Sequence, residues 1–468
     1  MHSRAEAPLL SWPLPVHLID RVLIPRSSVA GITWPALPAP QAAAMLALQY
    51  QLEQSQWWPP EMLREQQLRQ LAKTLEHACE TIPFYRERFL ACGLDPQSAH
   101  WPDDFPKLPL LSRADVQAAA GALLSTRPPP EHGAVSEGQT SGSTGRPIRF
   151  FNTTMTQFFW RVFTLREHLW HQRDFMGKLA AIRKVPEAGA RSGWGPSTDV
   201  VFDTGPSAAL KIETDTGQQA AWLQEQDPDY LLSFPSNIEA LARLCLAQGI
   251  RPGKLREVRA VGEVVTPELH RLCREAWGVR LVDVYSAQEV GYIALQCPET
   301  GHYHIQSEGV LVEILDAQGE PCKPGEVGRV VITTLHNMAM PLIRYEIGDF
   351  AEVGEACPCG RGLPVLKRIM GRVRNMLTLP SGAKRWPLMG IDRTHPAATS
   401  VKQYQFIQRS LDTIEVMLVT AWPLSQEEEA LRTHLQFKLG FEFTINFTYC
   451  EDIPRSAGGK FEDFRSEL

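Results

Sequence analysis

Between residues 178 and 284, short apolar segments alternate with helical ones, and this pattern limits the folds open to the chain. Strands are expected at residues 178–182, 200–202, 230–233 and 258–261, and helices at residues 237–248 and 267–277. Strands that alternate with helices pair in parallel, because each helix carries the chain back to the same edge of the sheet. We therefore predict an α/β sheet with parallel pairing in this part of the chain.

Further helices are expected on the N-terminal side, at residues 42–53, 65–89 and 150–170. The last of these is strongly aromatic, and its rings either pack against the sheet or form part of the wall of a pocket: Phe158, Phe159, Trp160, Phe163 and Trp170. Residues 1–64 are rich in Pro and Trp, and we interpret them as an irregular extension.

The C-terminal part has a pattern of its own. Strands are expected at residues 310–315 and 328–333, and after Gly371 the pattern restarts with strands at 403–408, 414–420 and 443–450 around a helix at 426–439. A chain of 468 residues exceeds the size at which one core keeps growing. We predict a large domain over residues 65–371 and a small, mobile α+β domain over residues 372–468.

Composition excludes several classes of function. The net charge of −6 gives no support for nucleic-acid binding through a basic surface, so small acidic ligands would need local positive sites. We find no apolar run long enough to span a membrane. No signal-peptide pattern precedes the first helix, so a cytoplasmic protein is expected. Nine cysteines, an odd number scattered over a long chain, indicate reduced thiols rather than a disulfide framework.

A segment of hydroxyl and glycine residues is the first candidate for ligand binding. It consists of Thr140, Ser141, Gly142, Ser143, Thr144 and Gly145. Glycines let the backbone approach an anion, and successive N–H groups and hydroxyls form a concave donor surface suited to phosphates. Arg146 and Pro147 follow where a Walker loop has Lys and Ser or Thr, which argues against that type of ATPase. The alternative is a flexible connector.

Six further motifs follow in a fixed order along the chain. They are residues 233–236 (Ser-Phe-Pro-Ser), Gly262-Glu263, residues 285–291 (Tyr-Ser-Ala-Gln-Glu-Val-Gly), residues 344–349 (Arg-Tyr-Glu-Ile-Gly-Asp), Gly371-Arg372, and residues 454–460 (Pro-Arg-Ser-Ala-Gly-Gly-Lys). Together with residues 82–89 and 108–112, this succession resembles the adenylate-forming superfamily of acyl-CoA synthetases, nonribosomal adenylation domains and luciferases. The phenylacetate-CoA ligases and their capsule-biosynthesis relatives are the most similar, from about residue 65 onward.

The resemblance implies an enzyme that joins a carboxylic acid to the α-phosphate of ATP, releases pyrophosphate, and transfers the acyl group to a thiol. The acceptor it implies is coenzyme A or a carrier protein, and the acid is an aromatic or apolar one. A scaffold that kept the fold without turnover is a different class of function, and a Walker-type ATPase is a third. Formation of AMP rather than ADP separates these alternatives.

The resemblance also assigns roles to individual residues. Lys460 would bridge the carboxylate and the α-phosphate, and Glu289 would bind the Mg²⁺ that accompanies ATP. Glycine-loop residues 140–145 would hold the β and γ phosphates. The remaining residues would contact adenine, ribose or the acyl group: Tyr285, Asp349, Arg372, Gly262, Glu263, Ser236 and Asn237.

The chain departs from the family pattern at two places. Ser286 and Gln288 replace a glycine and a hydroxyl residue beside Glu289, which puts one expected phosphate contact in doubt. Arg374 and Asn375 stand where the family often has paired aspartates, so the hinge after Arg372 is expected in place with altered chemistry.

Four residues form a candidate zinc site. Cys297 and His304 lie in one segment, and Cys357 and Cys359 follow about fifty residues later. Two separated pairs of thiolate and imidazole ligands suit tetrahedral Zn²⁺, and four protein ligands make a site structural. Similar positions occur in the phenylacetate-CoA ligase branch, which favours His304 over His302. Ordinary reduced thiols are the alternative.

Overall fold

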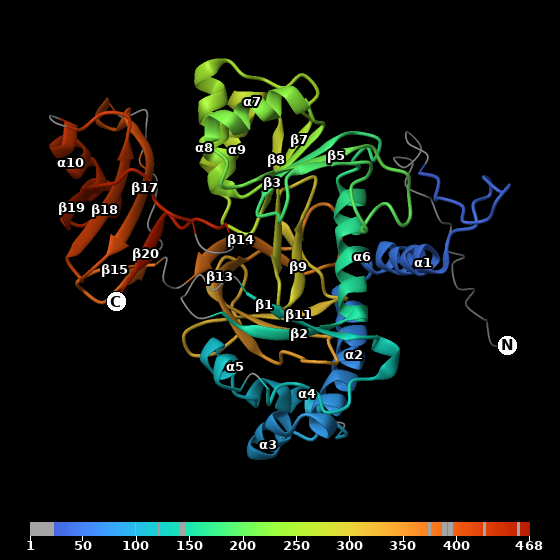
Figure 1. Cartoon of the computed structure of the whole chain (residues 1–468). Coiled ribbons are helices and arrows are strands. Elements are labelled where there is room, and N and C mark those ends of the chain that lie inside the picture. Colours follow the sequence, from blue (N-terminus) through green and yellow to red (C-terminus); the bar gives the residue numbers. More distant parts are fainter. Residues whose placement is uncertain are drawn as a thin grey trace, which may run out of the picture.

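The computed structural model describes residues 23–98, 100–119, 121–140, 147–372, 376–385, 391, 396–424, 427–455 and 459–468. A twelve-stranded mixed sheet with flanking helices forms the larger part, and a four-stranded sheet with one helix forms the C-terminal part (Figure 1). This confirms the predicted fold class of a large α/β domain followed by a small α+β domain.

The elements have the following bounds. The helices are α1 (Pro40–Ser55), α2 (Pro60–Thr81), α3 (Pro83–Cys92), α4 (Trp101–Asp104), α5 (Arg113–Ala119), α6 (Thr154–Trp170), α7 (Thr216–Gln226), α8 (Pro235–Gln248), α9 (Pro267–Trp277) and α10 (Glu427–Leu439). The strands up to the middle of the chain are β1 (Val135–Gln139), β2 (Arg149–Thr153), β3 (Leu179–Arg183), β4 (Gly189–Arg191), β5 (Ser207–Lys211), β6 (Tyr230–Ser233), β7 (Glu257–Val261), β8 (Arg280–Ala287), β9 (Gly291–Gln296) and β10 (Tyr303–Ile305). The later strands are β11 (Val310–Leu315), β12 (Val327–Thr334), β13 (Tyr345–Val353), β14 (Val365–Arg372), β15 (Leu377–Thr378), β16 (Lys384–Arg385), β17 (Val401–Gln408), β18 (Thr413–Thr420), β19 (Thr444–Tyr449) and β20 (Phe464–Ser466).

One half of the large sheet is parallel. Its strand order is β11-β12-β13-β14-β10-β9-β8-β7-β6-β3-β5-β4, and the neighbours from β8 to β5 pair in parallel. Parallel strands place their C-terminal ends at one edge, and ligands of open α/β sheets bind beyond that edge. The segments after β3, β6, β7 and β8 therefore meet on one side of the molecule.

Helices cover both faces of this parallel half (Figure 1). On one face α7, α8 and α9 bury apolar residues such as Leu241 and Leu269 against Ile182 and Val258. On the other face lies α6, which packs Phe163 in a cluster with Val284 and Tyr292 from β8 and β9. A parallel sheet needs this cover on both sides, because both of its faces are apolar.

The C-terminal sheet has the order β19-β18-β17-β20 and carries α10. Its strand β20 pairs in parallel with β17 and begins four residues after Lys460. The lysine segment is therefore attached directly to this sheet.

Three expectations need correction or qualification. The helix expected over residues 65–89 is two helices, because Pro83 drives Ile82 into an extended conformation (φ −125°, ψ 100°) and ends α2. The strand expected at residues 200–202 is a turn: the Asp199 carboxylate accepts the N–H groups of Trp194 and Gly195, and the turn buries Val201 in the core. The domain boundaries stay predictions, and the one at residues 64/65 falls inside α2. Among the described residues no helix is long and apolar enough to cross a membrane.

Candidate active site

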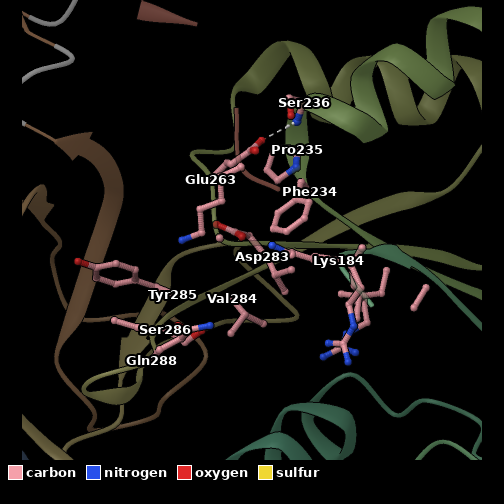
Figure 2. A pocket seen from close by; sticks show the side chains of 18 of the residues that line it. Lys184, Phe234, Pro235, Ser236, Glu263, Asp283, Val284, Tyr285, Ser286 and Gln288 are labelled. Carbon is pink, nitrogen blue, oxygen red and sulfur yellow. Dashed lines mark hydrogen bonds between the residues drawn. The ribbon is translucent and has the colours of Figure 1, made fainter. Parts of the chain in front are cut away.

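A cavity of about 1240 Å³ lies at the C-terminal edge of the parallel strands. Its walls come from the ends of β3, β6, β7 and β8, from α6, and from the segment around Lys460. Figure 2 shows Phe234 and Ser236 at the end of β6, Glu263 after β7, and Tyr285 at the end of β8. Three of the motifs found in the sequence therefore converge on one space.

Tyr285, Asp349 and Arg372 form one group at the β8 side of the cavity. Asp349 and Arg372 are opposite each other in the β13–β14 register, and Arg372 Nε lies 3.5 Å from Asp349 Oδ1. The Tyr285 hydroxyl donates to Asp349 Oδ2 at 2.9 Å. Burial, reinforced by the Asp349 charge, raises the pKa of Tyr285 well above its usual value. The structure thus brings together three of the residues predicted to bind the nucleotide.

Glu289 lies between β8 and β9 and lines the same cavity. Only 7% of the residue is exposed, and burial raises the pKa of its carboxyl group, while Arg113, Arg372 and Lys460 act in the opposite direction. Mg²⁺ requires the charged carboxylate, and the three cations favour that form against the larger effect of burial. Glu289 lies in the same cavity as the other residues predicted to bind the nucleotide, and its role as the Mg²⁺ ligand stays a prediction.

Lys460 reaches the cavity from the C-terminal sheet. Burial lowers the pKa of its ammonium group, as does Arg372, whereas Asp349, Glu289 and Glu263 raise it. Lys460 Cε lies 3.0 Å from the point that a Cβ on Gly262 would occupy, and Gly262 has a φ of +82°. Glycine at this position lets the lysine pass close to the end of β7.

Glu263 connects the two sheets. Its carboxylate accepts the backbone N–H of Ser236 at 2.9 Å and the backbone N–H of Phe461 at 2.5 Å. Arg455 lies 3.8 Å from the same carboxylate and donates to the Ser236 hydroxyl at 2.8 Å. Burial raises the pKa of Glu263 against the effect of these donors. Glu263 therefore holds the segment that carries Lys460, a contact that the sequence did not indicate.

Two other predicted residues lie at the start of α8. Ser236 lines the cavity beside Glu263, as described. Asn237 is 3% exposed, and its amide nitrogen donates to Gln219 Oε1 and Ser233 Oγ. Its predicted role in binding the acid stays a prediction.

The glycine loop can be followed only at its ends. Residues Ser141, Gly142, Ser143, Thr144 and Gly145 lie outside the described residues, as do Arg374 and Asn375 of the hinge. Thr140 lines the cavity, and both its N–H and its hydroxyl bond to the backbone of Ile148 at 2.9 Å. Arg113 donates to the Thr140 hydroxyl at 3.4 Å. The two ends of the loop are thus joined at the cavity edge.

The sequence analysis missed two arginines at the site: Arg113, which lines the cavity, and Arg455, which contacts the lining residues Ser236 and Glu263. Each lies in or directly after a segment that carried the resemblance, residues 108–112 and 454–460. An arginine in or next to such a segment could have been named as a candidate for the site. Anionic ligands require local positive charge, and the net charge of this chain is negative.

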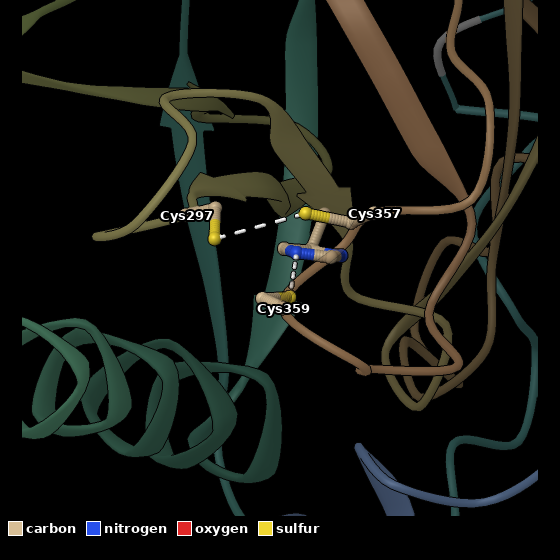
Figure 3. A group of neighbouring side chains, drawn as sticks. Cys297, Cys357 and Cys359 are labelled. Atoms are coloured by element: carbon tan, nitrogen blue, oxygen red, sulfur yellow. Dashed lines mark hydrogen bonds between the residues drawn. The ribbon is translucent and has the colours of Figure 1, made fainter.

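The four predicted zinc ligands lie together, and Figure 3 shows the three cysteines of this group, Cys297, Cys357 and Cys359. The sulfur atoms of Cys297, Cys357 and Cys359 and a ring nitrogen of His304 all lie within 4.8 Å of one another. Cys359 Sγ is 3.3 Å from His304 Nε2, and His304 Nδ1 lies 3.4 Å from the Leu363 carbonyl oxygen. Three sulfur ligands, one imidazole and a backbone group that orients the ring are the components of a structural zinc centre. The grouping selects His304 over His302.

Comparison with known proteins gives consistent results. Residues 389–466 match the family model described as the CapK C-terminal domain. A phenylacetate-coenzyme A ligase of Thermus thermophilus is 26% identical over 446 residues, which cover 86% of this chain and 96% of the relative. Protein CapK of Staphylococcus aureus is 27% identical over 190 residues, which cover 36% of this chain and 40% of the relative.

A solved structure shares the fold. The 2-hydroxyisobutyryl-CoA ligase in its postadenylation state superposes with a TM-score of 0.69 at 18% identity, over 89% of this chain and 92% of the other. The same ligase in its thioesterification state gives a TM-score of 0.57.

Proposed function

Because the chain belongs to the adenylate-forming ligase superfamily, in its phenylacetate-CoA ligase and CapK branch, we propose that it activates a carboxylic acid with ATP and transfers the acyl group to coenzyme A. Adenylation forms a bond between the carboxylate and the α-phosphate and releases pyrophosphate. Attack by the thiol then forms the thioester and releases AMP. The observation that carries the proposal is Lys460 in the cavity, close to Gly262 and within electrostatic reach of Glu289 and Asp349.

The residues act mainly by positioning and charge. Two anions, a carboxylate and a triphosphate, must approach each other, and a cation between them lowers the repulsion and stabilises the charge of the transition state. Lys460 would supply this cation. Asp349 accepts hydrogen bonds and would hold the ribose hydroxyls, with Tyr285 and Arg372 fixing its orientation.

Glu289 and the glycine loop would hold the other end of the nucleotide. Mg²⁺ when bound neutralises phosphate charge, and Glu289 would be its carboxylate ligand. Residues 140–145 would contact the β and γ phosphates.

The second half-reaction, in which the thioester forms, would require Lys460 to leave the cavity. The described contacts of the lysine segment with the large domain include those of the Phe461 N–H with Glu263 and of Arg455 with the Ser236 hydroxyl. Rotation of the small domain would break these contacts and open the carbonyl carbon to the thiol.

We propose that Cys297, His304, Cys357 and Cys359 bind one structural Zn²⁺. The distances within the group and the Leu363 carbonyl oxygen, which lies 3.4 Å from His304 Nδ1 and would orient the ring, support this assignment. The ion would connect β10 and the residue Cys297 before it to the segment that precedes β14, and it would take no part in the reaction.

The proposal is tested by supplying the purified protein with ATP, Mg²⁺ and a panel of carboxylic acids. We expect acid-dependent exchange of pyrophosphate into ATP and, when coenzyme A is added, AMP and an acyl-CoA. Lys460→Ala should abolish exchange, whereas Lys402→Ala, on β17 of the same small domain, should not. ADP as the only nucleotide product would refute the proposal, and AMP without an acyl-CoA would favour a carrier protein as acceptor.

A further inference from the structure

The wall of the cavity at β3 is basic. Arg183 ends β3, and it lines the cavity with Leu179 and Ala181, which share its face of the strand. Arg191 of β4 and Arg259 of β7 line the same cavity. We call these three arginines the basic wall.

A carboxylate neutralises the basic wall at Arg259 alone among its three described arginines. Arg259 pairs with the buried Glu167. For Arg183 and Arg191, no ion pair with a carboxylate occurs in the part of the chain that the structure describes. Arg183 and Arg191 are exposed residues at the open side of the cavity. Partial desolvation of Arg183 lowers its pKa, and the charges of Arg259 and Arg191 lower it further. Like charges that face one space raise the free energy of the protein unless an anion enters that space.

Arg183 on β3 and Arg191 on β4 are the two members of the basic wall that lie away from the nucleotide, whereas Arg259 on β7 lies next to β8. Tyr285 and Asp283 belong to β8, which is separated from β3 by β7 and β6. At about 4.8 Å between neighbouring strands, β3 lies roughly 14 Å from β8 and roughly 10 Å from β7, where Lys460 passes Gly262. Figure 2 shows Tyr285 and Lys184 at opposite sides of the cavity. The phosphates of ATP, which the glycine loop and Glu289 would bind, therefore leave these two arginines unused.

We propose that the acid carries a second anionic group, which the basic wall binds while Lys460 binds the carboxylate that reacts. Arg183 and Arg191 would hold this group through charge-assisted hydrogen bonds. Trp160 and Trp194 also line the cavity and would contact the apolar part between the two charges. The inference rests on the proposed function and narrows its substrate to dicarboxylic acids and related dianions that span roughly 6 to 10 Å.

The test compares matched acids that differ only in the second charge: adipate with hexanoate, and 4-carboxyphenylacetate with phenylacetate. Pyrophosphate exchange without coenzyme A gives kcat/KM for each acid. We expect the dianion to be preferred in at least one pair, and Arg183→Gln to lower kcat/KM for that dianion about tenfold or more with little effect on its monoanionic partner. Lys211→Gln is the matched control, because Lys211 lies opposite Arg183 in the β3–β5 register and does not line the cavity.

Binding without turnover separates this inference from the proposed function. Quenching of Trp160 and Trp194 fluorescence by the dianions, titrated without ATP, should be strong in the natural protein and weak in Arg183→Gln. Such binding without any exchange would refute the ligase proposal alone. Exchange that favours the monoanions, or equal effects of Arg183→Gln on both members of each pair, would refute the second anionic group alone. An effect of Arg183→Gln confined to the KM for coenzyme A would also refute it, because the wall would then bind the phosphates of coenzyme A.

Discussion

Replacing Glu263 by Gln should separate the two half-reactions. The carboxylate accepts two backbone N–H groups, from Ser236 in the large domain and from Phe461 next to Lys460. Glutamine keeps the shape of the side chain but replaces one acceptor oxygen by an NH₂ group, so one of the two N–H groups loses its acceptor. The lysine segment is then held less firmly in the cavity.

The size of the effect follows from the hydrogen bonds involved. A hydrogen bond to a charged group contributes about 1.5–3 kcal/mol. Burial of Glu263 raises its pKa, so part of this gain is offset by the cost of keeping the carboxylate charged away from water. We therefore expect a loss of about 2 kcal/mol, or about 30-fold in the rate of adenylate formation.

The assay is rapid quench with each half-reaction measured separately. Thioester formation from supplied acyl-adenylate should change less than about threefold, because Lys460 has left the cavity in that step. Glu268→Gln, an exposed carboxylate on α9, is the control. Equal losses in both half-reactions would show that Glu263 acts through general stability. A higher KM for ATP at unchanged kcat would show that it contacts the nucleotide instead.

Three further predictions address other parts of the molecule. Tyr285→Phe removes the hydroxyl that orients Asp349 and should raise the KM for ATP about fivefold with the melting temperature unchanged; an unchanged KM would show that Asp349 needs no such support. Cys357→Ser should remove the zinc measured by elemental analysis and lower the melting temperature by about 5 °C or more, whereas Cys450→Ser, outside the cluster, should do neither; metal-free natural protein would contradict the zinc assignment. Burial raises the pKa of Asp283 from 3.8 to about 6, so the neutral form stabilises the fold below pH 4 and this contribution is lost as the pH rises through 6. The free energy of unfolding, measured by chemical denaturation, should rise for Asp283→Asn relative to the natural protein by up to about 3 kcal/mol as the pH is raised from 4 to 7. A difference in this free energy that stays constant over the same pH range would refute the assignment.

Sequence patterns predicted best the helices and strands whose bounds follow from the pattern of apolar residues within the element itself. Strand β6 and helix α9 have the expected bounds, because an apolar run or a helical period is a local property. Residues 198–202 are as apolar as a strand, but the Asp199 carboxylate accepts the Trp194 N–H and holds the backbone in a turn. Val201 is buried in the core from this turn as completely as it would be from a strand. Side-chain burial alone does not distinguish the two conformations.

The site divides in the same way. The grouping of Cys297, His304, Cys357 and Cys359 was predictable because soft ligands in two pairs have a recognisable spacing. The contact between Glu263 and Phe461 joins residues 198 positions apart and depends on how the small domain is placed. The basic wall depends on the strand order β7-β6-β3, which brings Arg259 and Arg183 to one cavity although 76 positions separate them (259 − 183 = 76). Contacts of this kind appear only once the chain is folded.

Strand β14 has a mechanical consequence. Its first residue, Val365, is opposite His304 in the β10–β14 register, and Cys357 and Cys359 precede it, so the cluster anchors its beginning. Its last residue, Arg372, is the point from which the chain continues toward the small domain. The proposed rotation of the small domain would pull on this strand, which would transmit the force over roughly 23 Å to the four-residue cluster. The cluster would thus anchor the strand from which the small domain rotates. Disrupting the cluster would make the position of that domain less well defined without changing any residue of the cavity.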